Sequence, residues 1–68
     1  MSNYNAANQA RLKLKMKLSN YSWYVDSMVG FMDEGYGIII HTLKIDDKVR
    51  KEIPQVVDGI SIRTELKK

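Results

Sequence analysis

Apolar and basic residues alternate strictly along residues 11–18, which read Arg-Leu-Lys-Leu-Lys-Met-Lys-Leu. Such alternation is typical of a strand with one exposed and one buried face. The residue types favour a helix, because Leu, Lys, Met and Arg are good helix formers and none is β-branched. Residues 6–10, Ala-Ala-Asn-Gln-Ala, also favour a helix, and no Gly or Pro separates them from the alternating segment. We therefore favour a helix from Asn5 to Leu18, with a strand as the alternative for residues 11–18.

On such a helix, small and apolar side chains would divide between two opposite faces. At about 100° per residue, one stripe that suits a buried face contains Ala7, Ala10, Leu14 and Leu18. Leu12 and Met16 would point to the opposite side, about half a turn away. Because exposed apolar side chains of small proteins often mark contact surfaces, Leu12 and Met16 are the predicted protein interface.

Two further segments have the pattern of β-strands. In residues 23–32, Trp23, Val25, Val29 and Phe31 share one face at period two, and aromatic and β-branched residues are frequent. Residues 33–37 are predicted to form a turn, since two glycines are available there for positive φ. Residues 37–43 contain three consecutive isoleucines, which favours a central strand, so the two strands should form a hairpin.

The remaining sequence predicts a short helix and a last strand. Asp46 or Asp47 is a suitable N-cap for a helix over residues 48–52, and Pro54 prevents its continuation. Val49 and Ile53 would be its core-facing pair. Residues 57–59 indicate a turn in which Gly59 takes positive φ, and residues 60–66 alternate as a strand.

The predicted order is therefore helix, strand, strand, helix, strand. This corresponds to an α+β fold with a three-stranded mixed sheet and one long N-terminal helix packed on one face. Residues 1–68 would form a single small domain, with residues 1–4 and 67–68 frayed. The second face of the sheet would lack a cover, which self-association could supply.

Part of the second half follows a recurrent pattern. An apolar strand led by glycine (Gly37-Ile38-Ile39-Ile40) precedes a short helix, an Ile53-Pro54 step and the segment Asp58-Gly59-Ile60-Ser61-Ile62. Residues 37–62 in this respect resemble small α/β modules of uncharacterised bacterial proteins, some of which precede trypsin-like protease domains. The resemblance supports the fold and implies no activity, because no protease triad is present.

The small size of the chain and its lack of cysteine suggest that self-association would add to its stability. A chain of 68 residues buries only about 60% of its unfolded surface, and without cysteine it has no disulfide to stabilise it. Charge is also segregated: residues 1–20 carry four cations and no acid, residues 21–47 five acids and one base, and residues 48–68 six bases and three acids. Such segregation favours association with another copy or with an anionic partner.

Candidate catalytic groups have simpler structural explanations. Asp46 and Asp47 suit a helix N-terminus, the acids of residues 33–34 suit a solvated turn, and a lone His41 in a strand is an ordinary structural residue. The glycines of residues 35–37 precede a strand instead of a helix, so they make a poor phosphate loop. We predict no enzyme, no catalytic residue, no cofactor and no metal site.

The sequence therefore favours a non-enzymatic binding module that acts by protein–protein association, as a homo-oligomer or on a protein partner. A phage or mobile-element accessory or inhibitor protein fits this size and charge. The alternative is a nucleic-acid-binding protein in which Arg11, Lys13, Lys15 and Lys17 contact phosphates, with Tyr21, Trp23 and Tyr24 nearby. With no secretory signal and no apolar run of about 20 residues, we expect a cytoplasmic location and no membrane contact.

Overall fold

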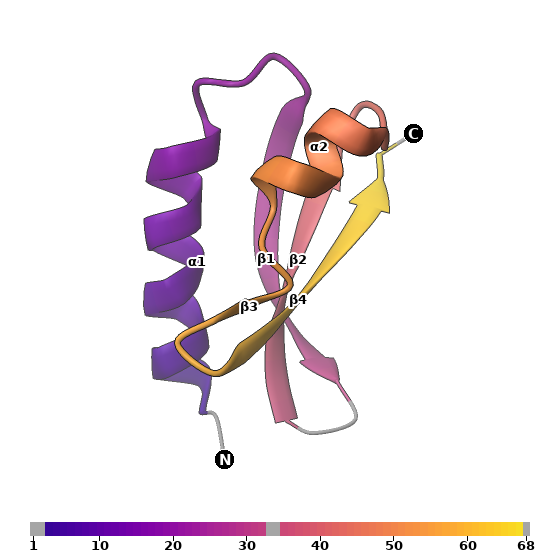
Figure 1. Ribbon diagram of the computed structural model, residues 1–68. Coiled ribbons are helices and arrows are strands. Elements are labelled where there is room, and N and C mark those ends of the chain that lie inside the picture. Colours follow the sequence, from indigo (N-terminus) through magenta and orange to yellow (C-terminus); the bar gives the residue numbers. More distant parts are fainter. Residues whose placement is uncertain (1–2, 33–34, 68) are drawn as a thin grey trace.

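The computed structural model describes residues 3–32 and 35–67, which form two helices and a four-stranded sheet (Figure 1). The elements in chain order are α1 (Tyr4–Leu18), β1 (Tyr24–Met32), β2 (Gly35–Thr42), α2 (Asp47–Glu52), β3 (Val56–Val57) and β4 (Ile60–Leu66). The α+β class, the long N-terminal helix and its packing on one face of a mixed sheet are confirmed.

Residues 11–18 are helical, so the helix interpretation of the alternating segment is confirmed. The side chain of Asn3 caps α1 by accepting a hydrogen bond from the Ala6 N–H at 2.8 Å. The predicted buried stripe is also confirmed, since Ala7, Ala10, Leu14 and Leu18 are all buried. The two alanines lack bulk beyond Cβ, which lets the first half of α1 lie close to the sheet.

The sheet has four strands, so the prediction of three is wrong. Its order is β1-β2-β4-β3, with β1 antiparallel to β2, β2 parallel to β4, and β3 antiparallel to β4. The additional strand β3 has only two residues, too few to show a period in the sequence. It joins β4 through Asp58 and Gly59, whose φ angles of 51° and 77° are those of a type I′ hairpin turn. The predicted positive φ of Gly59 is confirmed.

The hairpin of β1 and β2 differs from the prediction in two details. The predicted turn covers residues 33–37, but residues 35–37 belong to β2, so that part of the prediction is wrong; residues 33–34 lie outside the described residues. The register shifts between Tyr24 and Asp26, where β1 has one extra residue relative to β2. This bulge interrupts the strict period of two that was expected for Trp23, Val25, Val29 and Phe31, because each extra residue reverses the side-chain alternation.

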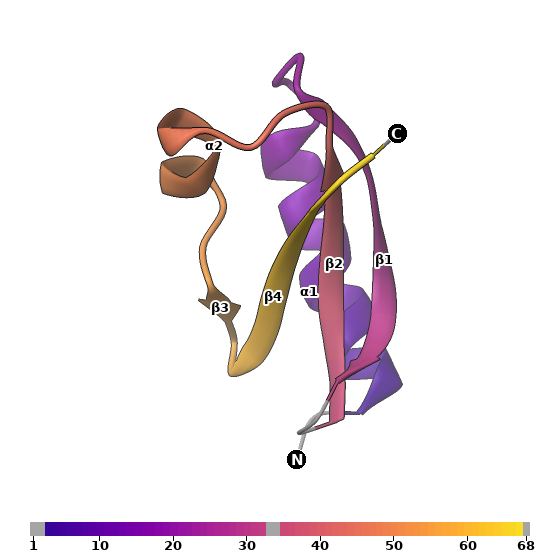
Figure 2. The same ribbon diagram turned by 90° about the vertical axis from the view of Figure 1, so that its right-hand side faces the viewer.

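Both helices lie on one side of the sheet, and the core forms between them and the strands. It consists of Ala7, Ala10, Leu14, Leu18, Trp23, Ile38, Ile40, Val49, Ile53 and Ile60. Figure 2 looks onto the opposite side, with α1 behind the strands; none of the described elements covers that face. We call it the open face.

The short helix α2 forms as predicted, with Asp46 as its N-cap and Val49 and Ile53 buried. Its last residue is tied to the loop after α1, since the Tyr21 hydroxyl donates to Glu52 Oε2 at 2.6 Å. This hydrogen bond, with partial burial and the charge of Glu52, raises the pKa of Tyr21. The Tyr21 ring also stacks on Trp23, with ring centroids 4.9 Å apart, so the loop is held against the core.

Candidate interaction surfaces

Three aromatic side chains meet at the end of the molecule where α1 begins. Tyr36 packs edge-to-face against both Tyr4 and Phe31, with ring centroids 5.8 and 5.4 Å apart. They come from α1, β2 and β1, and they are half of the six aromatic residues in the chain. Phe31 is 78% exposed and Tyr4 is 53% exposed. We call Tyr4, Phe31 and Tyr36 the aromatic cluster.

Sequence reasoning missed this cluster because it depends on tertiary register. Phe31 and Tyr36 are directly opposite each other near the free end of the hairpin, beyond the part of the sheet that Leu14 and Leu18 cover. Tyr4, on the first turn of α1, reaches Tyr36 there. The period-two pattern places Phe31 on the face that the helix covers, but nothing in the sequence shows that the helix leaves this end of the sheet uncovered.

The predicted interface residues Leu12 and Met16 lie on the outer face of α1. Leu12 is 43% exposed and Met16 is 79% exposed, which agrees with their position opposite the buried stripe. They are one helical turn apart, so their side chains are neighbours. We call them the helix ridge. Polar Asn5, Asn8 and Gln9 separate the ridge from the aromatic cluster along the helix surface.

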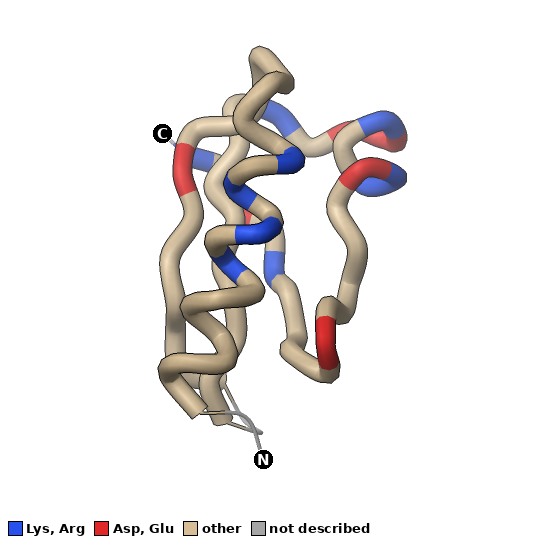
Figure 3. Tube along the Cα trace, turned by 90° about the vertical axis from the view of Figure 1, so that its left-hand side faces the viewer, with Lys and Arg blue, Asp and Glu red and all other residues tan. Residues whose placement is uncertain are grey.

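The four basic residues of α1 divide between its two flanks (Figure 3). Residues two apart on a helix are separated by about 200°, so Arg11 and Lys15 share one flank and Lys13 and Lys17 the other. Lys13 Nζ lies 3.2 Å from Asp58 Oδ2 in the β3–β4 turn, which assigns its flank to the β4 side. Arg11 and Lys15 therefore lie on the β1 side, where Arg11 Nε donates to Asn8 at 3.0 Å. Neither flank has more than two of the predicted phosphate-binding cations.

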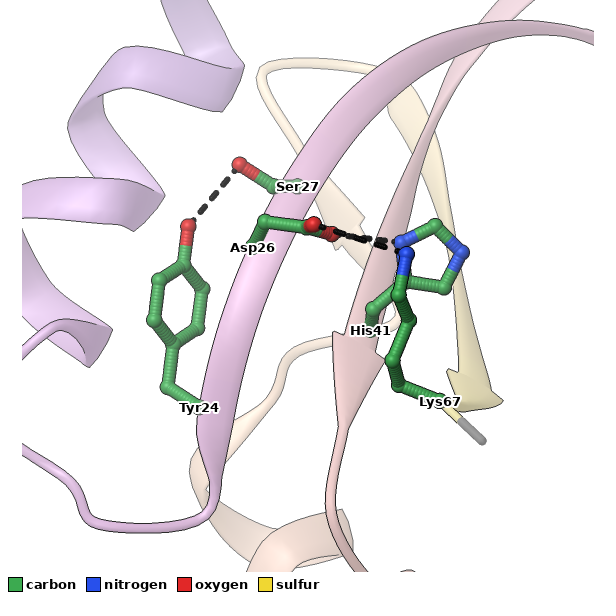
Figure 4. Close-up of polar contacts among 5 residues, drawn as sticks. All are labelled: Tyr24, Asp26, Ser27, His41 and Lys67. Atoms are coloured by element: carbon green, nitrogen blue, oxygen red, sulfur yellow. Dashed lines mark hydrogen bonds and ion pairs between the residues drawn. The ribbon is translucent and has the colours of Figure 1, made fainter.

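A polar group crosses one end of the open face. His41 on β2 donates from Nδ1 to Asp26 Oδ1 on β1 at 2.6 Å, and Lys67 Nζ is 3.8 Å from Asp26 Oδ2 (Figure 4). His41 and Asp26 are register partners, so the pair links the first two strands, and Lys67 adds the chain end that follows β4. The side chain of His41 is only 17% exposed.

Asp26 and His41 are hydrogen-bonded to each other as the Asp and His of a hydrolytic triad are, but the nearby serine is not placed as a nucleophile. The next residue, Ser27, points to the α1 side of β1, where it accepts a hydrogen bond from the Tyr24 hydroxyl at 3.0 Å (Figure 4). A serine nucleophile must be within hydrogen-bond reach of the histidine. Alternation along the strand instead places Ser27 and Asp26 on opposite faces. The pair therefore acts as a link between strands.

The other end of the open face is apolar. Ile39 lies across Gly30, since a Cβ built on that glycine would be only 2.8 Å from Ile39 Cδ1. Met32 lies across Gly37 in the same way. The glycines thus let large neighbouring side chains fold down onto the sheet, while Met28 beside them remains 48% exposed.

A pocket of about 340 Å³ lies between α2 and β4. It is lined by Ile45, Arg50, Ile53, Pro54, Gln55, Ile62 and Thr64. Arg50 is the single charged residue in this lining. General acid–base chemistry requires at least one positioned titratable group, and the lining supplies neither a carboxylate nor a histidine.

Comparison with protein-family models, curated proteins and solved structures finds no match to this chain. Within residues 3–32 and 35–67, no three metal-ligating side chains gather in a group that could hold an ion. The described helices include none with the length and apolar character needed to cross a bilayer. Function must therefore be inferred from the surfaces themselves.

Proposed function

We propose that this chain is a non-enzymatic binding module that acts by protein–protein association, first of all with a second copy of itself. The observation that supports this most strongly is the aromatic cluster, in which Phe31 is 78% exposed. Aromatic side chains bury large areas, and the residues that dominate binding energy at the centre of an interface are enriched in Trp, Tyr and Arg. The three residues of the cluster are themselves uncharged, and the acidic residues nearest to them in the sequence are Asp33 and Glu34.

The free energy gained by burying Phe31, compared with the cost of association, indicates that the whole aromatic cluster takes part in the contact. Burying one phenylalanine side chain stabilises by about 1.5–3 kcal/mol, or about 3–6 kcal/mol for both copies of a symmetric pair. Association costs about 4–15 kcal/mol in lost translational and rotational freedom. Burial of Phe31 alone offsets at most the lower part of this cost, so Tyr4 and Tyr36 are expected to supply further buried area.

The helix ridge suits a different contact. Leu12 and Met16 are surrounded by Lys13, Lys15 and Lys17, so a symmetric contact between two ridges would bring cations of both copies together. An acidic surface on a partner protein would meet the same ridge with favourable charge. We assign self-association to the aromatic cluster and a heterologous protein contact to the ridge.

Light scattering coupled to size-exclusion chromatography tests this division. The wild-type protein is expected to have a mass above that of a monomer at high micromolar concentration. Phe31→Ser should return it to a monomer, whereas the double variant Leu12→Lys with Met16→Lys should leave the mass unchanged. Circular dichroism of each variant controls for unfolding.

Two results would overturn parts of this proposal. A wild-type monomer at every concentration would refute self-association. Dissociation by the Leu12→Lys and Met16→Lys variant, with Phe31→Ser still associated, would move the contact from the aromatic cluster to the helix ridge.

A further inference from the structure

The two edges of the sheet are not equally protected. On one side, β4 is flanked by β3, a strand of two residues, and short edge strands give little opportunity for pairing. On the other side, β1 is an edge strand of nine residues. It contains no Pro, Lys or Arg, and its bulge lies at the start, so residues 26–32 pair regularly with β2.

The single charge on β1 does not guard this edge. Asp26 is engaged by His41 and Lys67, which come from the adjacent strand and the end of the chain. An edge strand presents every second backbone N–H and C=O group away from its sheet, where another strand can pair with it. The β1 edge thus has the backbone groups for strand addition and lacks the usual obstacles.

Side chains on the two sides of this edge differ in character. On the α1 side, the helix packs chiefly against β1 and β2, and the flank with Arg11 and Lys15 is the one nearer to β1. On the open face, Met28 is exposed and Met32 is partly exposed. A strand that alternates carboxylate and apolar side chains matches both sides at once.

We propose that the edge of β1 binds an extended segment of a partner protein by β-strand addition, with carboxylates of that segment facing Arg11 and Lys15. This rests on the proposed protein-binding function and names the class of partner. A second copy does not suit the edge. If two β1 strands paired antiparallel, both α1 helices would lie on the same face of the joined sheet, with their cationic flanks opposed.

Binding of synthetic peptides to the full chain tests the proposal. The probe is the heptapeptide Thr-Val-Glu-Val-Glu-Val-Thr, labelled with fluorescein at its N-terminal amine and amidated at its C-terminus, and the matched control has Lys in place of both Glu. Fluorescence anisotropy at low salt should give a dissociation constant below about 1 mM for the acidic peptide and much weaker binding for the basic one. No binding of the acidic peptide, or equal binding of both, would overturn the proposal.

Backbone pairing is tested by N-methylation. Two versions of the acidic peptide, methylated at alternate sets of residues, should differ sharply, because only one set of amides can face β1. Equal affinities for the two versions would exclude strand addition. Protection of alternate β1 amides from hydrogen exchange upon peptide binding would locate the contact, and protection elsewhere would contradict it.

Two variants of the chain provide the control for charge. Lys15→Gln on the β1 flank should weaken binding of the acidic peptide about two- to fivefold, while Lys13→Gln on the opposite flank should leave it unchanged. Equal effects would contradict the assigned orientation. Because the readout is peptide affinity, a failure here is distinguishable from a failure of self-association, which is measured as mass without peptide.

Discussion

Replacing Leu14 by alanine, with Leu12→Ala as a matched control, tests the assignment of residues 11–18 to a helix. Both residues are leucines of the same alternating run, two positions apart. In the structure Leu14 is 4% exposed against the sheet, while Leu12 is on the outer surface. In a strand they would share one face and be equivalent.

The expected costs differ by several-fold. Truncating a buried leucine to alanine costs about 2–5 kcal/mol, because transfer free energy is lost and a cavity remains. Truncating a half-exposed leucine on a helix surface should cost less than about 1 kcal/mol, since alanine is an equally good helix former. A chain of 68 residues typically has a free energy of unfolding of only about 3–10 kcal/mol. Leu14→Ala therefore removes a large share of the stability.

Urea unfolding followed by the fluorescence of Trp23 and by circular dichroism measures the difference. In thermal unfolding followed by circular dichroism, a loss of 2 kcal/mol in the free energy of unfolding should lower the melting temperature by about 8–16 °C in a domain of this size. Leu14→Ala should show at least this loss, and Leu12→Ala should stay close to wild type. Similar losses for the two variants would refute the helical assignment of this segment and with it the helix ridge.

Three other perturbations have defined outcomes. Gly59→Ala should lower the free energy of unfolding by about 1–2 kcal/mol in urea, because a φ of 77° strains an L-residue. Steric contact does not contribute, since no atom lies within 4 Å of the added Cβ. An unchanged urea midpoint would contradict the predicted turn. Thr42→Val should raise the free energy of unfolding by about 1 kcal/mol, because the Thr42 hydroxyl is buried without a hydrogen-bond partner among the described residues; a loss of stability would show that the hydroxyl is paired. The N–H of Val49 lowers the pKa of Asp46 below its ordinary 3.8, so the stabilisation by this cap is complete above that pH and disappears as the pH falls through the folded pKa. Asp46→Ala should accordingly lower the urea midpoint at pH 7, and the difference from wild type should narrow in acid; a constant difference would exclude this linkage.

Local patterns were sufficient for most of the fold. The stripe of Ala7, Ala10, Leu14 and Leu18 identifies a helix because a period of 3.6 is maintained over more than three turns. Pro54 and Asp46 bound α2 from both ends, and Gly59 marks a turn that only positive φ permits. In each case a few neighbouring residues carry the information.

The features that sequence reasoning missed depend on contacts between distant segments. The strand β3 has two residues and exists because the Asp58-Gly59 turn brings Val57 opposite Ile60. The aromatic cluster requires the register of Phe31 against Tyr36 and the position of the first turn of α1. The bulge in β1 is defined by its pairing with β2. No local pattern of hydrophobicity encodes these alignments.

Sedimentation equilibrium of the wild-type protein and of Phe31→Ser, over a concentration series into the high micromolar range, tests the central claim most directly. We expect the apparent mass of the wild type to rise above that of a monomer with concentration, and Phe31→Ser to remain a monomer throughout while keeping its circular dichroism spectrum. A wild type that stays monomeric, or a Phe31→Ser variant that associates as strongly as the wild type, would contradict the proposal that the aromatic cluster is an association surface.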